Sequence, residues 1–170
     1  MMNNKRIKDI VSIVVVIIIA LIIKIYIFSP VKVNGNSMVP TLNDGDYMLL
    51  NEIGYRINGV KRFDIVVANI NGEMLIKRVI GLPGEKIEYA YNKLYVNGEN
   101  VVENFKHDDT DDFSFDELEA KVVPENHYFL VGDNRGNSKD SRVVGFIPAN
   151  KIMGKTNFII YPFNRIGNVE

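Results

Sequence analysis

The sequence contains no cysteine, which excludes disulfide bonds, thiolate metal sites and a cysteine nucleophile. Charge of one sign is not in excess: 20 basic and 21 acidic residues leave a formal net charge of -1, so nothing points to a nucleic-acid partner. Long charge runs, internal repeats and low-complexity linkers are lacking too, which argues against disorder. A chain of 170 residues, 46% of them apolar, predicts one folded domain with an appendage.

One long apolar run lies near the N-terminus. From Ile10 to Ile23, only Ser12 and Ala20 interrupt branched aliphatic residues and leucine, and the apolar character continues past Lys24 to Phe28. A helix of this length comes close to the ~20 residues that cross the hydrocarbon of a bilayer. Lys24 lies near one end, where its long side chain can reach the headgroups. The pattern predicts a transmembrane anchor over residues 10–28.

The flanking charges predict the orientation of this anchor. Lys5, Arg6 and Lys8 precede the apolar run. Because basic residues favour the cytoplasmic side, residues 1–9 are expected inside the cell. Residues 29–170 are then an extracytoplasmic domain of a single-pass protein of the cytoplasmic membrane.

Two other interpretations of the apolar run are weaker. The part from Ile10 to Ile23 is short enough for a cleavable signal peptide, but the following residues, 26–30, are bulky and offer no small-x-small cleavage site. A buried core helix would show a polar face at helical spacing, and none recurs.

After Pro30, short β-branched and aromatic runs alternate with turn signals. Asn71-Gly72 and Asn97-Gly98 are favoured hairpin turns. One or two helical turns are expected between Phe113 and Glu119. The fold class predicted for this part is mainly β and antiparallel, with little helix. Strands are expected at 47–50, 64–70, 73–80, 86–91, 93–96, 127–131 and 151–161.

Ser37 is a candidate nucleophile. It lies between Gly35, which permits close approach of the backbone to a ligand, and Pro40, which stiffens the following turn. A serine on such a turn could attack a carbonyl, with backbone N–H groups nearby for the oxyanion. The pattern alone is equally compatible with an ordinary turn serine.

Lys77 is a candidate general base. Strand alternation after the Asn71-Gly72 turn places it on one face with Leu75 and Val79. Burial between them would lower the pKa of the amine, and a neutral amine could accept the serine proton. The simpler alternative is an edge-strand lysine with its head in water.

A third segment, Gly132 to Arg142, is dense in hydrogen-bonding side chains between two apolar stretches. It can form a network that positions other groups, or it can be a solvated loop. Neither of the two histidines has the sequence context of a general base: His107 lies in an acidic loop, and His127 opens a predicted strand beside two aromatic residues. No metal-ligand spacing is recognisable in the acidic residues 108–112.

The three segments, in this order behind an N-terminal anchor, resemble the bacterial type I signal peptidases in the short form common in Gram-positive bacteria. The resemblance runs from the anchor through the whole domain, and three motifs in order make it specific. The matching stretches are Asn36-Ser37-Met38-Val39-Pro40-Thr41-Leu42, Lys77-Arg78-Val79-Ile80-Gly81-Leu82-Pro83-Gly84, and the run from Gly132-Asp133-Asn134-Arg135 to Asn137-Ser138 and Asp140-Ser141-Arg142.

This resemblance implies a membrane-bound serine endopeptidase that removes signal peptides from exported preproteins without a cofactor or metal. Ser37 would be the nucleophile and Lys77 the general base. Ser138 would hydrogen-bond the lysine amine, and the Ser37 N–H would contribute to the oxyanion hole, whose second donor is open because Gly35 has no side chain. Structural pairs are expected between Asp140 and Arg142, and between Asp133 and either Arg78 or Arg135.

The family cuts after a small residue with another small residue two places upstream, which implies shallow apolar pockets. An extended substrate could pair with the chain on either side of them. The partners implied are signal peptides and the lipid bilayer. The residues expected to bind substrate are Val33, Gly35, Met38, Leu42, Leu75 and Ile76.

Other functions fit less well. The self-cleaving domains of SOS-type repressors share the serine–lysine chemistry but carry a DNA-binding module in place of an anchor. A relative that binds preproteins without cutting them is expected to have lost Ser37 or Lys77, and both are present. A purely structural tethered domain leaves the three motifs unexplained.

Overall fold

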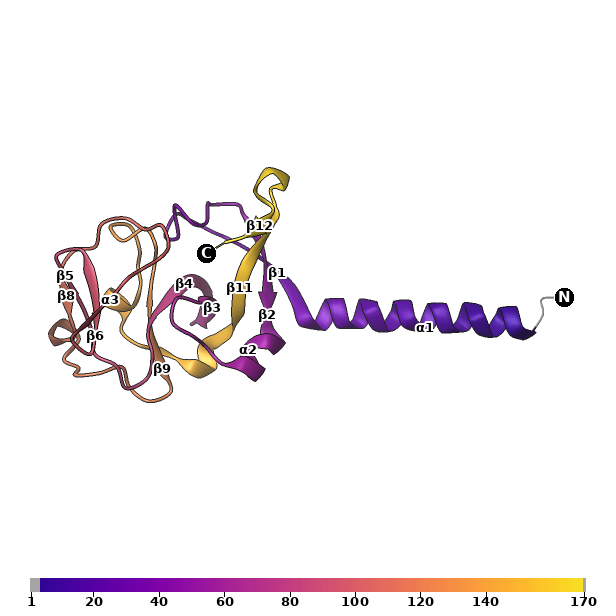
Figure 1. Cartoon of the computed structure of the whole chain (residues 1–170), viewed down its shortest axis with the longest axis horizontal. Coiled ribbons are helices and arrows are strands. Elements are labelled where there is room, and N and C mark those ends of the chain that lie inside the picture. Colours follow the sequence, from indigo (N-terminus) through magenta and orange to yellow (C-terminus); the bar gives the residue numbers. More distant parts are fainter. Residues whose placement is uncertain (1–3, 170) are drawn as a thin grey trace.

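The computed structural model describes residues 4–169, apart from the side chains of residues 4–7, 20–28 and 56, and it begins with one long helix. Helix α1 (Asn4–Ile27) extends away from the rest of the chain and leads directly into strand β1 (Phe28–Lys32) (Figure 1). Its large apolar side chains between Ile10 and Ile19 are exposed. Where side chains are described, no helix combines the length and apolar character needed to cross a membrane. The predicted anchor and N-terminal segment thus lie partly outside the described residues.

Most of the domain is an antiparallel sheet, as predicted. Its strand order is β1-β2-β11-β3-β4-β9-β10, and β12 pairs with β11. The sheet therefore joins strands from both ends of the domain, with β3 and β4 at its centre. These strands are β2 (Tyr47–Asn51), β3 (Ile65–Ile70), β4 (Glu73–Gly81), β9 (His127–Val131), β10 (Ile147–Pro148), β11 (Ile152–Tyr161) and β12 (Gly167–Asn168).

A smaller sheet lies at the end of the domain away from α1 (Figure 1). Its order is β7-β6-β5-β8, and the aromatic side chains Phe113, Phe115 and Phe129 pack together in its core. The helical turn expected between Phe113 and Glu119 is present as the 3-10 helix η1, which follows the short strand β8. The elements are β5 (Ile87–Ala90), β6 (Lys93–Val96), β7 (Glu99–Val101), β8 (Phe113–Ser114) and η1 (Phe115–Leu118).

Four short helical elements complete the fold. Helix α2 (Glu52–Asn58) had no counterpart in the predictions, because seven residues give too little periodicity to recognise. Its start is fixed by Asn51, whose side-chain oxygen accepts a hydrogen bond from the Gly54 N–H at 2.6 Å. The others are α3 (Ser141–Val144), capped by Asp140, and the 3-10 turns η2 (Ala149–Lys151) and η3 (Phe163–Arg165).

Both predicted hairpin turns are confirmed. Asn71 and Gly72 have φ angles of 52° and 91°, and Asn97 and Gly98 have 53° and 86°. Positive φ at both central residues matches the twist of the flanking strands, which is why asparagine and glycine occupy them. The first turn sets the register of β3 and β4, so that Lys77 lies opposite Val66.

Strand β4 departs from the expected alternation in its second half. Residues 76–81 are all buried, because β4 has β3 on one side and β9 on the other and apolar clusters cover both of its faces. The alternative of an edge-strand Lys77 with its head in water is therefore wrong. Burial of both faces of β4 therefore removes Lys77 from water.

Candidate active site

Ser37 sits on a loop that is fixed from both sides. Upstream, the Val33 N–H donates to the Asp46 carbonyl at 2.8 Å, and the Gly35 N–H donates to the Asp44 carboxylate at 2.7 Å. Gly35 has a φ of 83°, a conformation that favours glycine. Downstream, Met38 is fully buried in the core. The loop thus holds Ser37 half-exposed at the surface of a packed core.

The Lys77 side chain reaches Ser37 from strand β4. Its Nζ lies 2.7 Å from Ser37 Oγ and also donates to the Ile76 carbonyl at 3.0 Å. Lys77 is only 4% exposed. Burial lowers the pKa of its amine, while the charges of Asp140 and Asp133 oppose this effect. A lysine that loses its proton more readily can accept one from the adjacent hydroxyl, which is the chemistry of a nucleophile and its base.

A buried ion pair joins Arg78 to Asp133. The Arg78 guanidinium donates to both carboxylate oxygens, with Nε–Oδ1 at 2.9 Å and Nη2–Oδ2 at 2.7 Å. Thr41 Oγ1 donates to the same carboxylate at 2.6 Å. The Arg78 guanidinium also lies 3.8 Å from the Phe105 ring centre. Two partners were predicted for Asp133, Arg78 or Arg135. The observed partner is Arg78, whereas Arg135 pairs with Glu103 at 2.6 Å.

Asp140 and Arg142 form the second predicted pair. The Arg142 guanidinium contacts both carboxylate oxygens, at 2.9 Å and 2.8 Å. Its Nη2 also donates to the Arg135 carbonyl at 2.7 Å. Asp140 in turn accepts a hydrogen bond from the Gly132 N–H at 3.0 Å. These contacts close the segment 132–142 on itself, so it is a network and not a solvated loop.

Asn134 is a residue that the sequence analysis did not single out. Its backbone N–H donates to the Ser37 carbonyl at 3.1 Å, and its side-chain Nδ2 donates to the Asn36 carbonyl at 3.0 Å. Asn134 therefore donates hydrogen bonds to two consecutive carbonyls of the loop that carries Ser37. Its place in the third motif was the available signal, but a side chain that binds backbone leaves no partner to recognise in the sequence.

Ser138 lies close to the loop but does not make the predicted contact. Its Oγ is buried and has no hydrogen-bond partner among the described residues, so the expected bond to Lys77 is not formed. A Cβ on Gly132 would come within 2.2 Å of this oxygen and 2.4 Å of the Ser37 carbonyl. Only glycine fits between Ser37 and Ser138.

A cavity of about 190 Å³ opens beside the Ser37–Lys77 pair. Four of the predicted substrate-binding residues line it: Val33, Met38, Leu75 and Ile76. Gly35 and Leu42 do not. Gly35 bends the loop, and Leu42 is fully buried in the core, where no substrate could reach it.

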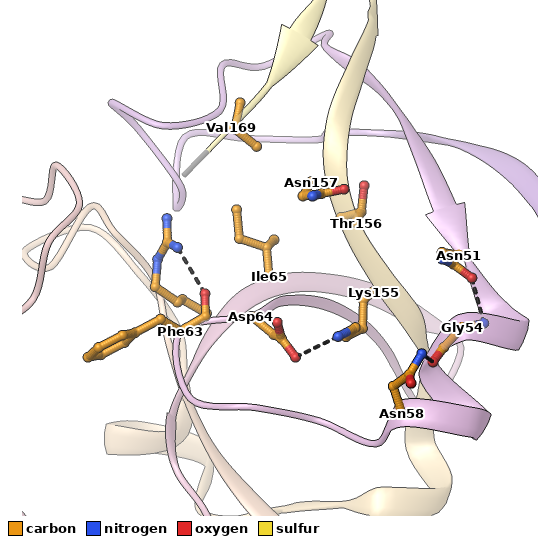
Figure 2. A pocket seen from close by; sticks show the side chains of 11 residues that line it. Asn51, Gly54, Asn58, Phe63, Asp64, Ile65, Lys155, Thr156, Asn157 and Val169 are labelled. Atoms are coloured by element: carbon orange, nitrogen blue, oxygen red, sulfur yellow. Dashed lines mark hydrogen bonds and ion pairs between the residues drawn. The ribbon is translucent and has the colours of Figure 1, made fainter.

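Neither histidine lines this cavity. His107 forms a 3.6 Å contact with Glu103, and His127 contacts the Glu125 carbonyl through Nδ1. Within the described residues, no three histidine or acidic side chains are arranged to hold a metal ion. A larger cavity of about 390 Å³ lies where Lys155 points toward Asp64 (Figure 2), and neither Ser37 nor Lys77 lines it.

Comparison with known proteins shows which family the chain is similar to. Residues 6–161 match the model of a family described as signal peptidase, peptidase S26. Signal peptidase IB of Staphylococcus aureus (strain N315) is 38% identical over 96% of this chain and 93% of its own length. Signal peptidase I of Bacillus caldolyticus is 40% identical over 84% and 85%. A crystal structure of a signal peptidase I from Enterococcus faecalis V583 aligns with a TM-score of 0.52 at 37% identity, covering 56% of this chain and 95% of that one.

The substitution Asn134→Ala tests whether the hydrogen bonds of Asn134 position the loop that carries Ser37. The change removes the hydrogen bond to the Asn36 carbonyl and should lower stability by about 1 kcal/mol. Because small displacements of reacting groups are costly, we expect peptide cleavage to fall about tenfold or more. Thermal unfolding and steady-state kinetics measure the two effects. Asn150→Ala, at an exposed position, serves as the control, and equal rates in both variants would contradict the role.

Burial of Lys77 also predicts a stability effect. The lowered pKa means that the unfolded chain binds more protons than the native protein between the native pKa and 10.5, so native stability rises with pH across that window. Lys77→Met removes the buried amine and should raise the free energy of unfolding at neutral pH by about 1 kcal/mol. This gain should shrink as the pH approaches 10.5. A gain that does not change with pH, or a loss, in denaturant titrations would contradict it. Lys93→Met, at an exposed position, is the control.

Proposed function

The chain belongs to the signal peptidases of peptidase family S26, and from that premise we propose that Ser37 and Lys77 carry out its reaction. The protein is a serine peptidase with signal peptidase I activity, which cleaves signal peptides from preproteins. The observation that carries the assignment of roles is the 2.7 Å contact between Nζ of the buried Lys77 and Oγ of the half-exposed Ser37.

The first step is attack on the scissile carbonyl. Neutral Lys77 takes the proton of Ser37, and Oγ bonds to the carbonyl carbon to give a tetrahedral oxyanion. The Ser37 N–H is our proposed donor to that oxyanion. The carbonyl of Ser37 is already held by Asn134, which fixes the orientation of this part of the loop. Support for Lys77 as the base comes from its burial, which lowers the pKa of the amine.

Lys77 then returns the proton to the leaving nitrogen, and the C–N bond breaks to release the new N-terminus. The signal peptide remains as an ester on Ser37 Oγ. Lys77, neutral again, removes a proton from a water molecule that attacks this ester. The ester bond breaks, the proton passes to Oγ, and the free enzyme is regenerated.

We also propose that residues 10–28 anchor the domain in the membrane, with residues 1–9 inside the cell. Support comes from the continuous helix α1, from its exposed apolar side chains, and from the basic residues that precede them. Seven residues separate Pro30 from Ser37, which is at most about 25 Å of extended chain. The nucleophile would therefore act close to the membrane surface, where a signal peptide ends.

Cleavage of a preprotein in detergent tests the roles of the two residues. The wild-type protein should cut after a small residue, whereas Ser37→Ala and Lys77→Ala should each lose activity by roughly 10³-fold or more. Lys77→Arg should fail as well, because arginine stays protonated. Circular dichroism should show that all variants are folded. Substantial cleavage by a folded Lys77→Ala protein would refute the base.

The pH dependence of kcat/KM tests the protonation state. Lys77 acts only when it is neutral, so the rate should rise with pH as the amine loses its proton. Because burial lowers its pKa, the midpoint should lie below the 10.5 of an ordinary lysine. A rate that stays flat between neutral pH and pH 9 would count against Lys77.

A further inference from the structure

A second cavity continues from the catalytic one. It has a volume of about 440 Å³ and shares Leu75 and Lys139 with the cavity beside Ser37. The two cavities are therefore neighbours, with these two side chains at their common wall, and we refer to them together as the path. The lining of the second cavity is Ile70, Asn71, Glu73, Leu75, Lys139 and Val144.

This second cavity lies between the β3–β4 turn and the segment that carries α3. In Figure 1, α3 lies on the side of the domain away from the point where α1 meets β1. The catalytic cavity, by contrast, is lined by Lys32, the last residue of β1, and by Val33 and Asn34, which directly follow it. The path therefore runs from the α1 end of the domain, past Ser37, toward α3.

The direction of this path relative to the membrane indicates which part of a substrate occupies each end. The apolar part of a signal peptide stays in the membrane, as α1 is proposed to do, so it reaches Ser37 from the β1 side. The residues that follow the scissile bond then leave in the other direction, past Lys139. The second cavity lies in that direction.

The walls of the second cavity carry one charge of each sign. Lys139 is exposed, and no carboxylate of the described residues forms an ion pair with it. Glu73, also exposed, likewise has no ion-pair partner in the described part of the chain. Lys139 lines both cavities, whereas Glu73 lines only the second, so Lys139 is the charge nearer to the cut. Ile70, Leu75 and Val144 provide the apolar surface between them.

We propose that this second cavity binds the first residues of the mature protein, the ones that follow the scissile bond. Lys139 selects an acidic side chain close to the cut, and Glu73 selects a basic one farther along. The inference rests on the proposed function, since it assigns a binding site to the substrate of the same reaction. It gives the protein a specificity for the mature N-terminus in addition to the small residues before the cut.

The test uses full-length protein in detergent and peptides that are identical up to the scissile bond. One series ends one to five residues after the cut. A second series carries Glu, Gln or Lys at each of these five positions in turn. We expect kcat/KM to rise as the peptide is lengthened beyond the first residue. Near the cut, Glu should be preferred over Lys about two- to fivefold, as for an exposed ion pair, and 0.5 M salt should weaken the preference.

Charge reversal identifies the side chains responsible. Lys139→Glu should invert the preference near the cut and leave the farther positions unchanged, while Glu73→Lys should act only at the farther positions. Lys139→Gln should abolish the near preference without inverting it. Ratios between peptides cancel any general effect of the new charge on Lys77. Lys93→Glu, in β6 of the smaller sheet, changes the net charge equally but lines neither cavity, and should leave every ratio unchanged.

The results separate this inference from the proposed function. Cleavage that is indifferent to every residue after the first, or a Lys139→Glu variant that slows all peptides equally, would overturn the second cavity as a binding site while the proposed function stands. A charge effect confined to residues before the cut would reverse the proposed path and overturn it as well. Failure of the wild-type protein to cut any peptide would overturn the proposed function and this inference together.

Discussion

The Asp133 carboxylate joins the three separate stretches of sequence that make up the site. It accepts hydrogen bonds from Arg78, the residue after Lys77 in β4, and from Thr41, four residues after Ser37. Its own segment continues to Asn134, which holds the loop of Ser37. The distance between Ser37 and Lys77 therefore depends on a buried ion pair in which neither residue takes part. Removing one partner of such a pair leaves a buried charge uncompensated, which is why its loss would disturb the whole arrangement.

The same contacts also govern the protonation of Lys77. Asp133 and Asp140 are the two charges that raise the pKa of its amine, and burial is the larger effect that lowers it. Each carboxylate is bound by an arginine, Asp133 by Arg78 and Asp140 by Arg142. Each arginine places a positive charge next to its aspartate, which weakens the field of that carboxylate at Lys77. The arginines thus act on the chemistry without touching the reacting atoms.

The sequence predicted those parts of the molecule that depend on local signals. The two Asn-Gly turns have a conformation that few other residues adopt, so they located the hairpins and the strand of Lys77. The motifs located Ser37, Lys77 and the pairs of Asp133 and Asp140. Strand alternation could not show that β4 is covered on both faces, since that depends on β9, about fifty residues away. Likewise, Leu42 was expected to bind substrate because apolar residues in the core and in a pocket look the same in a sequence. Asn134 and the contact of Gly132 with Ser37 and Ser138 depend on how segments pack, which no local pattern records.

Three cationic side chains in the described part of the domain are buried, and their partners differ in charge. Arg78 and Arg135 each pair with a carboxylate, Asp133 and Glu103. Lys77 instead has a hydroxyl and a carbonyl as its hydrogen-bond partners. A carboxylate against Lys77 would satisfy the ammonium, but it would also favour the charged form that cannot accept a proton. A neutral hydroxyl does not favour the ammonium in this way, so burial lowers the pKa of the amine and more of it is present as the free base that can accept the Ser37 proton. Among these three cations, the fold pairs the two arginines with carboxylates and gives the lysine a neutral hydroxyl, at the residue whose reactivity requires a neutral amine.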